Sequence, residues 1–340
     1  MSRLRRSNTA ASGITRRRCG KGFLYRSVDG TKVTDKDCLR RIRGLAIPPA
    51  WTDVWICPWP NGHIQAMGTD AAGRRQYRYH GDWRKRKDQE KFERAIEFGR
   101  ALPTLLKRVE NDLATPGLRK PRLLAMGVRL LYIGGFRIGG EEYAEEHETF
   151  GVATLQVRHV RIDGDRVIFT YRAKGSIKRS VAIDDPEILR AVRSLLRRSR
   201  RRSDDLLAWR QGTGWRNLRS TDLNAYIKET IGDQFSAKDF RTWSATVRAA
   251  SELATRADEA ASERQRKRTV DAAVAEVADH LGNTPAVCRS SYIDPRVIDC
   301  FHSGDTIGPA LAMSKRSGHS AGRRTEKAVI AMLTRSAEAA

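Results

Sequence analysis

The chain has 340 residues, of which 40% are hydrophobic, so it can bury the cores of two ordinary domains and is not disordered throughout. Its 64 Lys and Arg residues outnumber 40 Asp and Glu residues, which gives a formal net charge of +24 and a positive field that attracts polyanions. Nucleic acid is therefore the expected partner and no membrane is expected, because no apolar run reaches the roughly 18 residues of a transmembrane helix.

The N-terminal part is expected to be rich in β-structure. Residues 1–19 predict a basic disordered arm, since the first 18 residues hold many Arg, Ser and Thr residues and no acidic one. Residues 20–87 predict a β-rich DNA-binding domain, because short β-prone runs alternate with Gly, Pro and Asn. The expected elements are strands at Phe23 to Tyr25, Trp51 to Ile56, His63 to Met67 and Gln76 to Tyr79, and a helix near Lys36 to Gly44.

Basic and aromatic residues are interleaved at the end of this domain, over residues 74–87. The two-residue period of a strand puts Tyr77 and Tyr79 on one face, where they and neighbouring arginines can meet bases and phosphates together. The residues expected to contact DNA here are Arg74, Gln76, Tyr77 and Tyr79. The alternative is an ordinary solvated strand whose tyrosines pack inward.

Residues 88–302 predict a larger, mainly helical domain. The apolar spacing favours helices at 88–112 (kinked or split near Pro103), 123–133, 186–199, 221–231, 239–256 and 264–281. Strands at 154–160, 167–171 and 180–183 predict a small three-stranded sheet, with a turn at 163–165. The basic run from Arg197 to Arg202 is either a DNA contact or a charged helix end. Residues 303–340 predict a Gly-, Ser- and Arg-rich tail.

The five scattered cysteines, Cys19, Cys38, Cys57, Cys288 and Cys300, form no close Cys or Cys/His grouping, so reduced cysteines of a cytosolic protein are expected. There is no P-loop, dinucleotide-binding fingerprint or serine nucleophile motif. Without paired carboxylates for a two-metal site, chemistry on DNA would depend on arginine and lysine, so no metal and no cofactor is expected.

Several short segments become informative through their order. They are Ile47 to Trp51, Gly73 to His80, Phe136 to Gly139, Glu148 to Gly151, Ala173 to Ser176, Lys238 to Trp243, Leu281 to Pro285 and finally Tyr292. In this order and spacing the chain resembles the type IB DNA topoisomerases, in particular their compact bacterial and poxvirus-like branch. The resemblance extends from about residue 20 to residue 305.

The resemblance implies an α+β protein in which a small β-rich domain and a larger catalytic domain form a C-shaped clamp on duplex DNA. It assigns Tyr292 as the nucleophile that becomes a 3′-phosphotyrosine, Lys174 as the general acid, and Arg137, Arg241 and Asn283 as the groups that bind the phosphate. Lys238 is a further expected DNA contact. The implied enzyme is an ATP- and metal-independent monomer that acts on double-stranded DNA in the cytoplasm, on the nucleoid.

Each of these residues also has a plainer reading when taken alone. Arg137 could pair with Glu141 or Glu142, Lys174 could be a turn residue, and Tyr292 could be a core aromatic. Asn283 stands where many relatives have histidine, and an amide can donate one hydrogen bond but adds no charge. His280 is expected to pack in its helix rather than replace that histidine.

Two other functions remain open from the sequence. A tyrosine recombinase uses the same chemistry but usually has histidine three residues before the second arginine, where this chain has Lys238. A non-catalytic DNA-binding protein would share the charge and the aromatics, and the catalytic pattern would then be a coincidence.

Overall fold

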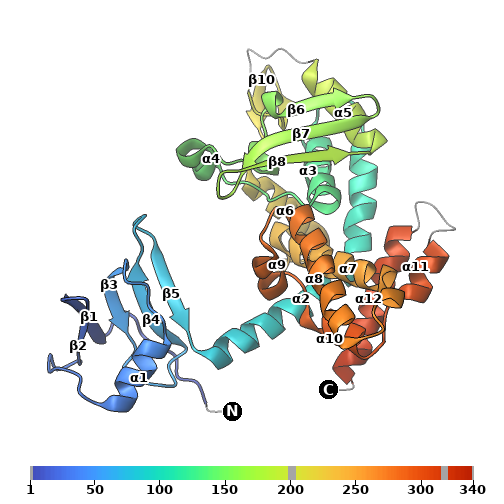
Figure 1. Ribbon diagram of the computed structural model, residues 1–340. Helices are drawn as coiled ribbons and strands as arrows, with labels where there is room; N and C mark the ends of the chain where they lie inside the picture. Colours follow the sequence, from blue (N-terminus) through green and yellow to red (C-terminus); the bar gives the residue numbers. More distant parts are fainter. Residues whose placement is uncertain (1–2, 198–203, 315–320, 339–340) are drawn as a thin grey trace. The chain divides into compact units, whose positions relative to one another are not determined.

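The computed structural model describes residues 3–197, 204–314 and 321–338, so most of the basic run from Arg197 to Arg202 lies outside the described residues. By their internal contacts the residues form two units, Met1–Lys91 and Phe92–Ala340, called here the N-terminal and the C-terminal unit (Figure 1). The boundary between the two units lies inside a helix. No helix among the described residues is long and apolar enough to cross a membrane.

The N-terminal unit is built on a five-stranded antiparallel sheet. Its strands are β1 (Ile14–Cys19), β2 (Gly22–Arg26), β3 (Thr52–Ile56), β4 (Ile64–Thr69) and β5 (Arg75–Tyr79), in the order β2-β1-β3-β4-β5. Helix α1 (Lys36–Gly44) is capped by Asp35, whose carboxylate accepts a hydrogen bond from the Cys38 amide at 2.6 Å. It covers one face of the sheet, where the buried apolar residues are Ile14, Ile42, Val54, Ile56 and Ala66.

The disordered arm expected over residues 1–19 is wrong. Residues 14–19 form β1, which pairs with β2 and β3, and Ile14 is buried. Upstream of the strand, the Ser7 amide donates to His63 Nδ1 at 2.8 Å. The arginine-rich composition suggested disorder, but at least one of these arginines is a structural residue. The Arg16 guanidinium lies over the Phe23 ring and donates to three carbonyls of the loop at 47–51.

The C-terminal unit is mainly helical. Its helices are α2 (Gly81–Leu113, which begins in the N-terminal unit), α3 (Lys120–Gly134), α4 (Glu141–His147), α5 (Pro186–Leu196), α6 (Ser220–Ile231), α7 (Ala237–Thr255), α8 (Glu263–Leu281), α9 (Pro285–Ser291), α10 (Pro295–His302), α11 (Gly308–Ser314) and α12 (Ala321–Glu338). An antiparallel sheet contains β6 (Val160–Asp163), β7 (Arg166–Ala173) and β8 (Ile177–Ile183), and β9 (Ala208–Gln211) and β10 (Gly214–Asn217) form a hairpin.

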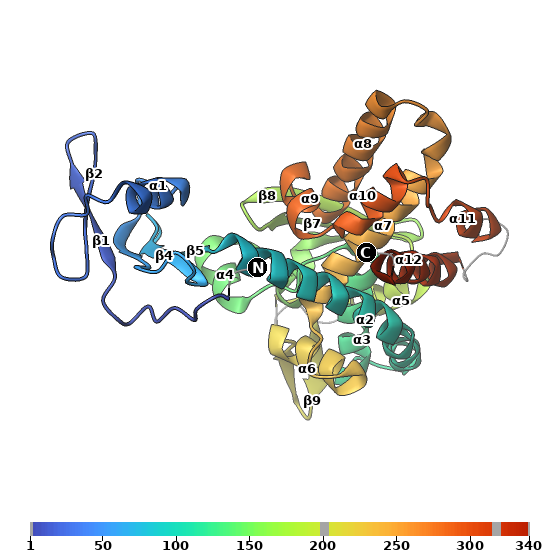
Figure 2. The same cartoon turned by 90° about the horizontal axis from the view of Figure 1, so that it is seen from below.

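Helix α7 is the centre of this unit. It contacts α3, α6, α8, α10, α11 and α12 (Figures 1 and 2). Its Trp243 is buried and packs so closely on α2 that a Cβ atom at Gly99 would collide with the indole ring. A side chain on α7 is therefore held by packing from several directions, which suits a residue that must keep a fixed position.

Three local expectations for this unit are wrong. Residues 152–159 contain two short 3₁₀ turns instead of a strand, and the strand begins at Val160. Helix α2 is not split near Pro103 but runs through it as one element. The expected tail contains α11 and α12, and α12 buries Val329, Met332 and Leu333 in the core, so residues 303–340 are not merely a polar tail.

Candidate active site

The backbone before Arg137 is fixed by an aromatic anchor. Gly135 ends α3 in the left-handed region with φ of 57°, which glycine adopts without strain. The next residue, Phe136, is fully buried; its ring stacks on Tyr171 and meets the edge of Phe169, both on β7. This anchor leaves Arg137 half-buried at the surface of the unit.

Two glycine-containing segments of the sequence lie together behind Arg137. The Val152 amide donates to the Arg137 carbonyl at 2.9 Å, and Gly151 lies so close to Gly139 that neither position has room for a side chain. Glu141, one of the alternative partners of Arg137, instead accepts hydrogen bonds from the amide and hydroxyl of Ser220. Arg137 is therefore placed by its backbone and not by an ion pair with Glu141.

Arg241 lies on α7 and is 4% exposed. Its Nη1 donates to the Gly135 carbonyl at 2.7 Å and its Nη2 to the Leu281 carbonyl at 2.9 Å. Its Nε is a buried donor that has no acceptor among the described residues. Burial, followed by the charge of Arg137, lowers the pKa of Arg241 to about 10, so the group remains charged at neutral pH.

Asn283 follows the C-terminus of α8, where Gly282 caps the helix with φ of 60°. The Asn283 amide donates to the Ala278 carbonyl at 2.9 Å, which closes the helix end. Arg137 Nη2 donates to Asn283 Oδ1 at 2.5 Å, whereas Asn283 Nδ2 is a second buried donor with no acceptor among the described residues.

Tyr292 follows α9, and its half-buried ring lies 5.2 Å from the Arg241 guanidinium. Burial acts to raise the pKa of Tyr292, but the charges of Arg241 and Arg137 outweigh it and hold the pKa below its ordinary value of 10. The ionised phenol, which is the nucleophilic form, is therefore favoured in this environment.

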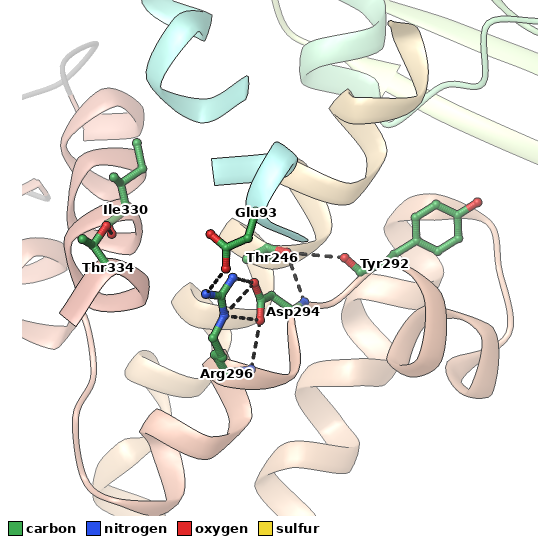
Figure 3. Close-up of polar contacts among 7 residues, drawn as sticks. All are labelled: Glu93, Thr246, Tyr292, Asp294, Arg296, Ile330 and Thr334. Carbon is green, nitrogen blue, oxygen red and sulfur yellow. Dashed lines mark hydrogen bonds and ion pairs between the residues drawn. The ribbon is translucent and has the colours of Figure 1, made fainter. Parts of the chain in front are cut away.

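The backbone beyond Tyr292 is held by Thr246 of α7 (Figure 3). The Thr246 hydroxyl donates to the Tyr292 carbonyl at 3.4 Å and accepts from the Asp294 amide at 3.2 Å. Asp294 begins α10 and is bound by Arg296, which also pairs with Glu93 of α2 at 2.7 Å. Figure 3 shows the Tyr292 ring pointing away from this network, so the network fixes the backbone and leaves the phenol available.

Arg179 of β8 is a third arginine in this region, and the sequence analysis did not identify it. It is 9% exposed and donates to the carbonyls of Gly134 and Gly135 at 3.0 Å, and to that of His280. It thus ties the end of α3 to the end of α8, the two helix ends that precede Arg137 and Asn283. The available signal was strand alternation, which puts Arg179 on the same face as the buried Ile183.

These three arginines, Arg137, Arg179 and Arg241, form what we call the arginine cluster. Within the described ranges no carboxylate forms an ion pair with any of them. Concentrated positive charge in a partly buried site, with unused donors, is suited to bind an anion such as a phosphate.

Lys174 and Lys238 lie outside this group of contacts. Lys174 is exposed in the turn between β7 and β8, where Gly175 and Ser176 have φ of 79° and 59°. Lys238 is exposed in the first turn of α7. In the described part of the chain, no polar contact connects either lysine to the arginine cluster.

His280 packs between helix ends. A Cβ atom at Gly135 would come within 2.8 Å of its Nε2. Burial, followed by the charges of Arg248, Arg179 and Arg241, lowers the pKa of His280 to about 3, so the ring is neutral at physiological pH. This arrangement supports the packing role expected from the sequence.

The other candidate DNA contacts lie on or beside β5 in the N-terminal unit. Tyr77 and Tyr79 are each 41% exposed and their rings stack with centroids 6.0 Å apart, so they do not pack inward. Arg74 and Gln76 both donate to Asp70, at 3.0 and 2.9 Å.

Comparison with known proteins connects these observations. Residues 80–299 match the family model of the catalytic core of eukaryotic DNA topoisomerase I, and residues 22–70 match that of the N-terminal domain of bacterial DNA topoisomerase IB. DNA topoisomerase 1B of Acanthamoeba polyphaga mimivirus is 31% identical over 296 residues, which are 86% of this chain and 88% of the relative. DNA topoisomerase 1B of vaccinia virus (strain Copenhagen) is 20% identical over 82% of this chain and 87% of the relative.

The catalytic-core model covers most of the chain, and the bacterial model accounts for much of the sheet that precedes it. The segments that suggested the resemblance lie within the two matched ranges, except for residues 73–79, which fall between them. This protein belongs to the type IB DNA topoisomerases.

Proposed function

We propose that this topoisomerase relaxes supercoiled DNA by transient cleavage of one strand at Tyr292. The phenolic oxygen attacks a backbone phosphorus, the bond from phosphorus to the 5′-oxygen breaks, and the enzyme becomes joined to the 3′ end as a phosphotyrosine. The free end rotates about the intact strand, and the 5′-hydroxyl then attacks the phosphotyrosine and restores the original bond. One phosphoester replaces another in each step, so resealing needs no ATP.

The buried donors beside Tyr292 are the observation that carries this proposal. Arg241 Nε and Asn283 Nδ2 have no acceptor among the described residues, and unsatisfied buried donors are rare in native proteins. Two non-bridging oxygens of a phosphate would satisfy them, with Arg137 as a further donor. The negative charge that these oxygens gain in the five-coordinate transition state would then be neutralised by Arg137 and Arg241.

Lys174 is proposed to protonate the leaving 5′-oxygen, which is a poor leaving group as an alkoxide. Its exposed position in a turn with glycine next to it is compatible with a movement of the turn toward bound DNA. Asn283 is proposed to donate a hydrogen bond to the phosphate without adding charge.

Contact with the duplex is proposed to include the N-terminal unit. Tyr77, Tyr79, Arg74 and Gln76 would meet the DNA from β5, and Lys238 from α7. We propose that the two units act as a clamp around double-stranded DNA, that the enzyme is a monomer, and that it works on the nucleoid in the cytoplasm.

Plasmid relaxation tests the proposal. Wild type, Tyr292→Phe and Lys174→Ala are compared in EDTA without ATP, and detergent is added to trap covalent complexes. We expect the wild type to relax positive and negative supercoils. Tyr292→Phe should bind DNA and form no adduct, because it lacks the attacking oxygen. Lys174→Ala should form the adduct roughly 10²- to 10⁴-fold more slowly, the usual contribution of a general acid.

Two results would contradict the proposal. An adduct formed by Tyr292→Phe would place the nucleophile elsewhere, and cleavage by Lys174→Ala at the wild-type rate would remove Lys174 from the mechanism. Thermal unfolding of each variant serves as the control for correct folding.

A further inference from the structure

The N-terminal sheet has two faces of different character. One face is covered by α1 and contains the buried residues Ile14, Ile42 and Ile56. Tyr77 lies on the other face. The register pairs it with Met67, and pairs Met67 with Trp55. Trp55 alternates along β3 with Val54 and Ile56, which point to the covered face, so Trp55 and its paired residues point away from it. We call this second surface the open face.

The register allows the open face to be followed across all five strands. Opposite residues in neighbouring strands point to the same side of a sheet. Tyr77 on β5 is opposite Met67 on β4, Met67 is opposite Trp55 on β3, Trp55 is opposite Thr15 on β1, and Thr15 is opposite Arg26 on β2. One continuous row thus crosses the sheet from the exposed Tyr77 to the exposed Arg26.

Trp55 occupies the middle of this row and lies against a glycine. The Trp55 ring lies over Gly13, where a Cβ atom would collide with the indole, and its Nε1 donates to the Ala11 carbonyl at 2.9 Å. Met67 is 6% exposed beneath its neighbours. The centre of the open face is therefore apolar, and the polar groups that could reach a ligand lie on β1 and β5, on either side of it.

A cationic group lies on each side of this apolar centre. Arg75 precedes Tyr77 on β5 by two residues, and Arg17 follows Thr15 on β1 by two residues; both are exposed and both point to the open face. Because β1 and β5 run in opposite directions, both arginines are displaced from the row in the same direction along the strands. In the described part of the chain, neither has an ion pair or a hydrogen bond to its side chain.

The spacing of the two arginines suits a DNA groove. Strands β1 and β5 are three strand positions apart in the sheet order, which is about 14 Å at about 4.8 Å per strand. The major groove of B-DNA is about 12 Å wide. The open face has aromatic rings near its β5 edge and an unpaired arginine on each of β1 and β5. Such a surface can therefore contact the phosphates that flank one groove.

We infer that the open face binds duplex DNA across its whole width and that Arg17 of β1 is a phosphate contact, so the surface is not limited to the β5 residues. This inference rests on the proposed contact between β5 and DNA. The basic residues of β1 then bind DNA as part of a rigid sheet, and not as the disordered arm that the sequence analysis expected.

Adjacent arginines on β1 provide a matched test. Arg18 is also exposed but points to the face covered by α1, so Arg17→Ala and Arg18→Ala remove the same charge from opposite faces of one strand. Both are made in the Tyr292→Phe background, in which binding is measured without cleavage. Fluorescence anisotropy with a short duplex then gives the affinity over about 50 to 200 mM salt.

Arg17→Ala should bind several-fold more weakly, with the slope of log K against log salt smaller by about 0.9, the value of one phosphate contact. Arg18→Ala should leave that slope unchanged, and Arg17→Lys should retain the slope because it keeps the charge. Equal slopes for Arg17→Ala and Arg18→Ala, or a larger effect of Arg18→Ala, would overturn the inference.

Tyr77→Ala separates failure of this inference from failure of the proposed β5 contact. If Tyr77→Ala weakens binding and Arg17→Ala does not, the β5 contact stands and its extension to β1 is wrong. If neither weakens binding, both are wrong. Thermal unfolding confirms that each variant retains the sheet.

Discussion

Tyr292 is under two opposing influences. Burial disfavours its ionised form, whereas Arg241 and Arg137 favour it, and the arginines dominate. Arg241 is also bound to the carbonyls of Gly135 and Leu281, so its position does not depend on the tyrosine. The charges that favour ionisation of Tyr292, the proposed nucleophile, are thus already in place, which is the arrangement expected of a preorganised site.

Arg241→Gln should change the pH dependence of cleavage. The substitution removes the charge but leaves the burial, so the pKa of Tyr292 should rise and the ionised fraction at neutral pH should fall. In single-turnover cleavage from about pH 6 to 10, the rising limb should move to higher pH, and the rate at pH 7 should fall by about 10²-fold or more, the usual cost of losing a transition-state donor.

Arg248→Gln is the matched control, since Arg248 is an exposed arginine on the same helix. Its pH profile should match that of the wild type. If Arg241→Gln lowers the rate equally at every pH, Arg241 stabilises the transition state without tuning the nucleophile.

The sequence pointed to the residues of the family motifs but not to the residue that supports them. Arg137, Arg241, Asn283 and Tyr292 come from segments far apart in the chain, and they lie together in the structure. Arg179 could not be found in this way, because its role is to bind three carbonyls whose positions depend on tertiary structure. Its only local sign is an inward-facing position in a strand.

At the scale of elements, the connection between α7 and α10 determines where Tyr292 lies. Thr246 bonds to the backbone on both sides of Ile293, so the position of Tyr292 depends on the same helix that carries Arg241. A shift of this segment would separate Tyr292, the proposed nucleophile, from the charge of Arg241 even if both side chains were intact.

Thr246→Val should therefore reduce cleavage more than binding. Valine has a similar shape but leaves the buried Asp294 amide without its acceptor, a cost of about 1–3 kcal/mol. We expect a melting temperature lower by a few degrees and about a tenfold slower single-turnover cleavage, since each 1.4 kcal/mol in the barrier is tenfold in rate.

Thr255→Val is the control, because Thr255 lies on the same helix and its hydroxyl donates to the Ser251 carbonyl at an exposed site. It should change neither quantity. Cleavage by Thr246→Val at the wild-type rate, together with a lowered melting temperature, would show that Thr246 contributes only to stability.

Two of the elements that the sequence analysis did not predict, β1 and α12, were hidden by composition. In β1 the arginines at positions 16 and 18 share the inner face with Ile14, and the aliphatic part of Arg16 can pack there as an apolar chain does. In α12 the spacing of Val329, Met332 and Leu333 is that of an amphipathic helix, but it follows a long stretch rich in Gly, Ser and Arg. In both segments the inward-facing residues had the spacing of the element, but the polar composition around them favoured a segment without regular structure.

At the scale of the whole molecule, the C-terminal unit is complete only when the last helix has docked. Glu326 of α12 is 7% exposed and accepts hydrogen bonds from Tyr132 of α3 and from Trp243 of α7, both at 3.3 Å. Arg323 pairs with Glu110 of α2, and Arg335 pairs with Asp305. The end of the chain thus braces α3 and α7, whose ends carry or precede Arg137 and Arg241.

This docking predicts a stability that depends on pH. Burial raises the pKa of Glu326 above its ordinary value of 4.5, so the folded protein binds this proton more tightly than the unfolded chain does. The resulting stabilisation is complete below about pH 4.5 and is lost as the pH rises through the folded-state pKa. At neutral pH the buried carboxylate therefore costs free energy, about 1.4 kcal/mol for each pKa unit by which it is raised.

Glu326→Gln should remove this cost because the amide stays neutral and its oxygen can still accept from Tyr132 and Trp243. We expect the melting temperatures of variant and wild type to be similar at pH 5 and that of the variant to be higher at pH 8, by about 2–4 °C per kcal/mol in a unit of this size. Glu338→Gln, at an exposed position on the same helix, should have no such effect. If Glu326→Gln were instead less stable at pH 8 than at pH 5 relative to the wild type, the ionised carboxylate would be a stabilising partner of Tyr132 and Trp243, and the docking of α12 would depend on charge and not on neutral hydrogen bonds.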